Sequence, residues 1–148
     1  MTIKEQIQNA LKEAMKSKQT ARLEVLRMAK GALLLKEKEK EAGAGLSDED
    51  AVAALRAEVR KRQQAAETFR ELGKEETAAE AETEIAVLEE FLPQQLSEAQ
   101  LEEKARAYIA EHPDINHPGK LTGALKKELG DRADGKMLNQ VCRKVLGA

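Results

Sequence analysis

The chain has 148 residues, of which 35% are charged and only 2% are aromatic, and its formal net charge is -2. This length permits one domain or two small ones, and a composition rich in Ala, Leu, Glu and Lys is typical of amphipathic helices. Its single cysteine, Cys142, excludes an intrachain disulfide and a Cys-x-x-Cys metal site. No stretch resembles a secretion signal or a membrane span, so we expect a cytoplasmic protein without a membrane partner.

Two helices are predicted in the first 45 residues. The first covers residues 2–16, where Thr2 and Glu5 have the spacing of a capping box. Its apolar positions recur at helical spacing and are Ile3, Ile7, Leu11 and Met15. The second helix has Leu23, Leu26, Ala29 and Leu33 and continues into alternating Lys and Glu. We expect it to end at the glycines of residues 43–45.

The next two helices form a predicted hairpin. Ser47 caps the third helix, carboxylates occupy its first turn, and Gly73 closes it. Its apolar positions are Val52, Leu55, Val59, Ala66, Phe69 and Leu72. The fourth helix has Ala78, Ala81, Ile85, Leu88 and Leu92. Because the turn between the two helices is short, we expect them to run antiparallel.

Pro93 cannot continue a helix, and residues 93–96 are therefore predicted to link two bundles. Ser97 and Gln100 have the spacing of a second capping box, which starts the fifth helix. We expect the fifth helix to end at Pro113. The predicted domains are thus residues 1–92 and 97–148.

Two more helices are predicted in the second domain. Pro118 suits the first turn of the sixth helix, which ends at Gly130 and has Leu121, Leu125 and Leu129 on one face. The seventh starts near Asp134 and buries Met137, Leu138, Val141, Cys142, Val145 and Leu146. No segment alternates as a strand does. The expected fold is all-α, with a four-helix N-terminal bundle and a three-helix C-terminal bundle.

No catalytic constellation emerges from the sequence. The hydroxyls of Ser47 and Ser97 are explained as helix caps, and no serine has a base beside it. His112, Asp114 and His117 have metal-binding side chains, but two prolines interrupt them, which favours a polar loop. Cys142 lies in an apolar stripe, where a thiol is usually a small core residue. We predict no catalytic residue, no metal site and no cofactor.

Basic side chains gather in two regions. The third helix carries several arginines, but the fourth helix opposes them with a series of glutamates that would offset much of their charge. Residues 118–148 contain seven Lys or Arg against three Asp or Glu, a formal charge of +4. No acidic helix lies within this second segment, so it is the stronger candidate for an anionic partner.

Helical geometry places the cations of residues 118–148 on solvent faces. In the sixth helix, Lys120, Gly123 and Lys127 share the face opposite the leucines, and a glycine between two lysines would let a phosphate come close. Lys136 and Arg143 form the exposed stripe of the seventh helix. The predicted nucleic-acid-binding residues are Lys120, Gly123, Lys127, Arg132, Lys136, Arg143 and Lys144. An ordinary solvated face, with Gly119 and Gly123 permitting close helix packing, remains the alternative.

The near absence of aromatic residues argues against stacking on single-stranded bases. A folded, double-helical RNA contacted through its phosphates and shape fits better.

Several short motifs resemble the YqeY family. They include Glu-Ile-Ala-Val-Leu at residues 84–88, Leu-Pro-Gln-Gln-Leu at 92–96, Gly-Lys at 119–120 and Ala-Asp-Gly at 133–135. The resemblance covers essentially the whole chain. This family, GatB/YqeY, is similar to the tail domain of the B subunit of the tRNA-dependent Glu/Asp amidotransferase.

The resemblance implies the four-plus-three helix fold and contact between the last bundle and the outer part of tRNA. The positions that it implies to face tRNA are Lys120 and Arg132. The catalytic region of the amidotransferase has no counterpart in this sequence. Any amidotransferase activity would therefore belong to the catalytic region to which the tail domain is joined in the B subunit, rather than to the residues of this chain.

Three functions follow from the sequence, in order of preference. The first is a non-catalytic accessory module that binds tRNA beside an aminoacyl-tRNA synthetase or an amidotransferase subunit. The second is a protein-interaction adaptor that uses exposed parts of the second and third helices without RNA. The third is a component of a glutamine-dependent carbon-nitrogen ligase, an amidotransferase. The sequence leaves the oligomeric state open.

Overall fold

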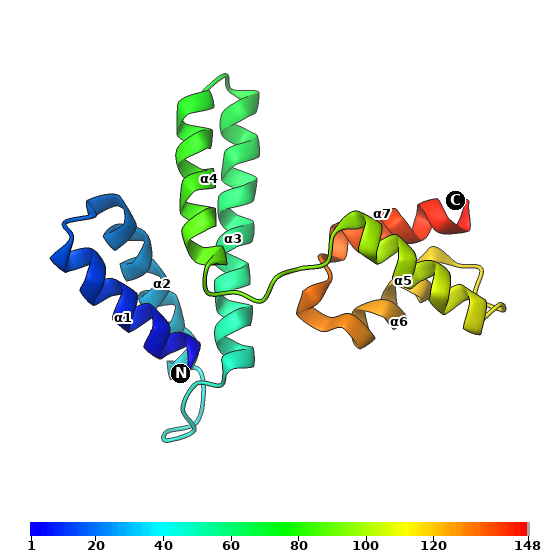
Figure 1. Cartoon of the computed structure of the whole chain (residues 1–148), viewed down its shortest axis with the longest axis horizontal. Helices are drawn as coiled ribbons and strands as arrows, with labels where there is room; N and C mark the ends of the chain where they lie inside the picture. Colours follow the sequence, from blue (N-terminus) through cyan, green and yellow to red (C-terminus); the bar gives the residue numbers. More distant parts are fainter. Residues whose placement is uncertain (148) are drawn as a thin grey trace. The chain divides into compact units, whose positions relative to one another are not determined.

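The computed structural model describes residues 1–147, which contain seven α-helices, one 3-10 turn and no strand (Figure 1). The predicted all-α class is therefore confirmed. None of the described helices is long and apolar enough to cross a membrane. The chain divides into two compact units, residues 1–92 and residues 93–148, which we call the first and second units.

The first unit contains four helices. They are α1 (Ile3–Lys16), α2 (Thr20–Lys38), α3 (Asp48–Glu71) and α4 (Glu75–Glu89). The longest, α3, turns at Gly73 and runs back as α4, so the two form the expected antiparallel hairpin (Figure 1). Gly73 has a φ of +76°, a conformation that glycine adopts without strain.

One cluster of aliphatic side chains holds the first unit together. Ile7, Leu26, Leu33, Leu55 and Leu88 are fully buried in it and come from all four helices. A smaller cluster of Ala66, Ala78 and Ala81 with Phe69 joins α3 to α4. Small alanine side chains allow the two backbones of the hairpin to approach closely along that stretch.

Two predicted core residues are exposed, and helix geometry explains both. Met15 is 58% exposed, while Ala14 is buried in its place. A strict four-residue spacing drifts by 40° at each step, so position 14 returns to the buried face and position 15 does not. Leu72, 64% exposed, lies at the C-cap of α3 and well off its buried stripe.

The second helix ends earlier than predicted. α2 stops at Lys38, five residues before Gly43, because the alternating Lys and Glu residues offer no apolar face that packing could hold in helical form. The segment that follows is tied to the start of α3 by an ion pair between Lys40 and Asp50.

Arg62, one of the arginines of the third predicted helix, occupies a core position of α3. It is only 7% exposed. Its guanidinium lies 3.0 Å from Glu84 of α4 and 2.9 Å from Glu58 of its own helix. The same group donates to the sulfur of Met28 on α2 at 3.5 Å. Arg62 therefore connects three helices through polar contacts at the edge of the core.

The second unit contains three helices around its own aliphatic core. They are α5 (Glu98–Glu111), α6 (Pro118–Leu129) and α7 (Gly135–Leu146), with a 3-10 turn, η1 (Gly130–Arg132), between the last two. The fully buried core includes Leu101, Leu121, Leu138 and Cys142. The predicted capping box of Ser97 and Gln100 is present at the start of α5, as is that of Thr2 and Glu5 in α1.

We expect the substitution Arg62→Met to lower the free energy of unfolding by about 1–3 kcal/mol at pH 7, because it leaves Glu58 partly buried without its main partner. Burial alone would raise the pKa of Glu58, but hydrogen bonds from Arg62 and Lys61 outweigh burial and lower it. The stabilisation that accompanies a lowered carboxyl pKa is present at neutral pH and is lost as pH falls below about 4.

The difference in free energy of unfolding between the unaltered protein and Arg62→Met, measured by urea denaturation, should therefore be smaller at about pH 3.5 than at pH 7. Arg60→Met is the matched control, because Arg60 is exposed on the same helix; its effect should stay within about 0.5 kcal/mol. Equal losses for both substitutions would contradict the role given to Arg62.

Candidate nucleic-acid interface

The start of α6 is fixed by a histidine cap. The backbone N–H of Gly119 donates to Nδ1 of His117 at 3.0 Å, and Pro118 occupies the first turn, where its missing N–H is no loss. Leu121, Leu125 and Leu129 then turn one face of α6 into the core. The opposite face must stay in water.

Lys120, Gly123 and Lys127 lie exposed on that opposite face, as the sequence predicts. A Cβ atom added at Gly123 would meet nothing within 4 Å, so this glycine is not required for packing against another described residue. A Cβ at Gly119 would lie 3.0 Å from the ring of His117, the cap of its own helix. Close helix packing, the alternative explanation of the two glycines, thus finds no support at Gly123.

The turn between α6 and α7 is held from several sides. Gly130 has φ +57° and ψ -132°, a conformation open only to glycine, and it redirects the chain into η1. The linker then fastens this turn: the N–H of Leu96 donates to the Arg132 carbonyl at 2.7 Å, and the Gln95 amide donates to the Asp131 carbonyl at 3.0 Å. The backbone of Arg132 is thereby fixed, while its side chain is exposed.

Like α6, the last helix, α7, buries one apolar face and exposes its basic side chains on another. The Asp134 carboxylate caps α7 by accepting from the N–H of Met137 at 3.0 Å. Leu138, Val141 and Cys142 are buried. The stripe of Lys136, Gln140 and Arg143 is exposed.

Two of the seven positively charged side chains of residues 118–148 have local partners. Lys144 lies 3.2 Å from Glu102 of α5, a carboxylate that also binds Arg106 at 2.9 Å. Hydrogen bonds from Arg106 and Lys144 lower the pKa of Glu102, so it stays ionised at neutral pH. Lys126 donates to the carbonyl of Ala133.

The other five form no ion pair with any residue between 1 and 147. They are Lys120, Lys127, Arg132, Lys136 and Arg143.

The second unit as a whole is less basic than its last two helices. Residues 93–117 carry five acidic and two basic side chains, a formal -3, so the +4 of residues 118–148 becomes +1 for the unit. The acidic residues of α5 account for much of this difference, and α5 packs against α7. Any attraction for an anion must therefore be local to the exposed faces of α6, η1 and α7.

The basic residues of α3 are largely paired, as expected from the opposing glutamates. Arg62 binds Glu84, and Arg70 binds Glu75 and Glu82. These contacts raise the pKa of Arg70, mainly through the hydrogen bond that its guanidinium donates to Glu82. The α3–α4 hairpin therefore offers less uncompensated positive charge than α6 and α7.

The residues considered for other chemistry have structural roles. The His112 ring stacks on Tyr108, with centroids 4.2 Å apart, and His117 caps α6. No three His, Cys, Asp or Glu side chains between residues 1 and 147 are grouped so as to hold a metal ion. Cys142 is completely buried, and burial raises the pKa of its thiol. Ser47 and Ser97 accept from backbone N–H groups at helix starts.

A protein-family model described as "Yqey-like protein" matches residues 4–146, nearly the whole chain. A comparison with curated proteins finds no match.

Proposed function

Because the chain belongs to the YqeY family, we propose that it is a non-catalytic accessory module that binds tRNA through the exposed faces of α6, η1 and α7. The proposal places it in the cytoplasm, beside an aminoacyl-tRNA synthetase or an amidotransferase subunit. It requires no catalytic residue and no cofactor.

The single observation that carries the proposal is the absence of local partners around five exposed cations. The side chains of Lys120, Lys127, Arg132, Lys136 and Arg143 form no ion pair within residues 1–147. A phosphate that binds such a cation displaces only water and counterions, whereas binding to Arg70 would first break contacts with Glu75 and Glu82. Gly123 lies between two of the cations and adds no bulk to that face.

Lys144 contributes less to this proposed site than its five neighbours. Its charge is shared with Glu102, and this carboxylate would repel a phosphate placed near the end of α7. We therefore centre the proposed contact on α6 and η1.

The proposed ligand is a folded RNA, recognised by its phosphates. Stacking on unpaired bases needs aromatic faces, but Tyr108 is already stacked on His112, and Phe69 and Phe91 are partly buried in the first unit. Phosphate contacts need only exposed cations on a rigid backbone.

The second candidate is a protein-interaction adaptor without RNA, favoured by the exposed apolar residues of α2 such as Leu35. Its complex should survive nuclease treatment and charge reversal at Lys120 and Arg132. The third candidate, a component of a glutamine-dependent carbon-nitrogen ligase, requires that this protein alone turn over substrate.

We also propose that the two units are separate bundles, of four and three helices. Each has its own aliphatic cluster, and compact units with separate cores can fold alone. A fragment of residues 93–148 should therefore unfold cooperatively on heating, followed by circular dichroism, and should bind tRNA with the salt dependence of the whole chain. A fragment that lacks helical structure at all temperatures would contradict separate bundles.

Binding to unfractionated tRNA should weaken steeply as salt rises, because each neutralised phosphate releases counterions. Fluorescence polarisation at several salt concentrations should give a log–log slope that becomes shallower by about 0.9 for each of Lys120→Ala and Arg132→Ala, with affinity about three- to tenfold lower. Lys104→Ala removes an exposed cation from α5 of the same unit and should change neither quantity. A tight complex with a flat salt slope, or no complex at low salt, would refute the proposal.

The substitution Gly123→Ala should change tRNA affinity and thermal stability in opposite directions. Alanine favours a helix interior over glycine by about 1 kcal/mol and meets no neighbour here, so the thermal midpoint should rise. If a phosphate approaches the backbone at this point, tRNA affinity should nevertheless fall. Gly31→Ala in α2 has the same open surroundings and should raise stability without changing affinity. Unchanged affinity in Gly123→Ala would show that the RNA does not approach this glycine.

A further inference from the structure

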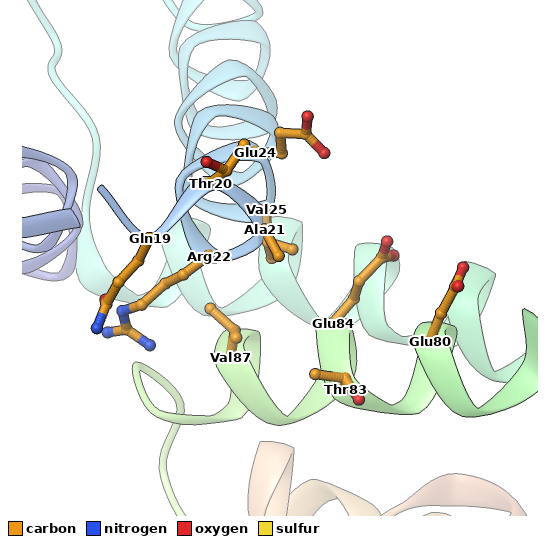
Figure 2. A pocket seen from close by; sticks show the side chains of 10 residues that line it. All are labelled: Gln19, Thr20, Ala21, Arg22, Glu24, Val25, Glu80, Thr83, Glu84 and Val87. Carbon is orange, nitrogen blue, oxygen red and sulfur yellow. The ribbon is translucent and has the colours of Figure 1, made fainter. Parts of the chain in front are cut away.

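A groove lies between the beginning of α2 and the second half of α4, within the first unit (Figure 2). Its volume is about 700 Å³. Val25 of α2 and Val87 of α4 provide apolar lining, and Glu80, Glu84 and Val87 rise from α4 on the side that faces α2 (Figure 2). Neither the periodicity nor the motifs of the sequence indicate this feature, since it depends on how two non-consecutive helices approach each other.

The charge of this α2–α4 groove is negative. Its lining includes three carboxylates, Glu24, Glu80 and Glu84, against the guanidinium of Arg22. Arg22 is bound by Glu90 at 2.6 Å, and Glu84 is bound by Arg62 at 3.0 Å.

Glu24 and Glu80 remain as two exposed carboxylates, one from each wall of the groove. Neither has an ion pair with another residue in the described part of the chain, 1–147. The groove therefore combines apolar lining with uncompensated negative charge on both sides.

An exposed apolar strip continues from the groove along α2. Ala21 lines the groove, and Met28 and Leu35 follow on the same helix face at seven-residue intervals. Met28 is 55% exposed and Leu35 is 66% exposed. The 14 helical steps from Ala21 to Leu35 span roughly 21 Å, which is enough to contact about four turns of a partner helix.

We propose that the α2–α4 groove and this strip bind an amphipathic helix of another protein, one that carries Lys or Arg beside its apolar stripe. Apolar side chains of the partner would cover Val87, Met28 and Leu35, and its cations would meet Glu24 and Glu80. This interface lies outside the second unit and is independent of the proposed tRNA contact.

The charges argue for a different protein rather than a second copy of this chain. A symmetric dimer formed through the groove would place Glu24 and Glu80 of one copy near the same residues of the other, and like charges in such an arrangement are destabilising. The same carboxylates would repel a nucleic acid.

The test uses two designed helical peptides of about 18 residues with identical leucine stripes. One carries Lys on both flanks of the stripe and the other carries Glu. Titration of the whole, ¹⁵N-labelled protein should show that the Lys peptide shifts the amide signals of Val25, Thr83 and Val87. It should bind at least about tenfold more tightly than the Glu peptide, which corresponds to about 1.4 kcal/mol.

A double charge reversal, Glu24→Lys with Glu80→Lys, should invert the preference in favour of the Glu peptide. Glu98→Lys with Glu103→Lys changes the net charge equally, at exposed positions of α5, and should preserve the original preference. All four positions are exposed, so circular dichroism should show unchanged helix content.

Several results would overturn the proposal. They include the absence of binding by either peptide, equal binding of both peptides by the unaltered protein, and shifts confined to residues outside the groove. Concentration-dependent shifts of the groove signals without peptide would identify a second copy as the occupant and would equally overturn it. The weaker tRNA binding expected of Lys120→Ala is a separate measurement on the other unit and does not affect these outcomes.

Discussion

The burial of aliphatic stripes at helical spacing determines which faces of this protein remain in water. With so few aromatic residues, both cores rely on Leu, Ile, Val and Ala, and each helix must direct a narrow stripe inward. Leu121, Leu125 and Leu129 thereby hold Lys120 and Lys127 outward on α6. A change in that spacing would rotate the cations as well as the core.

Pairing, rather than the number of basic residues, distinguishes the two positively charged regions. The arginines of α3 act mainly within the fold, since Arg62 and Arg70 join α3 to α4. The cations of α6, η1 and α7 have few such contacts, and only Lys144 among the candidates is held by a carboxylate. The cations of this region that form no internal ion pair remain available to an external partner.

The elements and most of the core followed from local sequence signals. Capping residues such as Ser97, glycines such as Gly73 and Gly130, and apolar periodicity act within one or two turns, so they can be recognised without the fold. Within single helices, the spacing misplaced Met15 and the end of α2. Other features depend on where helices meet: Arg62 can occupy a core position because Glu84 of another helix compensates its charge. The same limit applies to Lys144 with Glu102 and to the α2–α4 groove, which no single segment encodes.

The burial of Cys142 has a practical consequence for studying both proposed surfaces. Its thiol is completely enclosed and its pKa is raised, so little of it is present as the reactive thiolate at neutral pH. A cysteine introduced at an exposed position would be the only thiol that readily accepts a maleimide dye or spin label. The natural chain can therefore carry a single reporter on either unit without first being made cysteine-free.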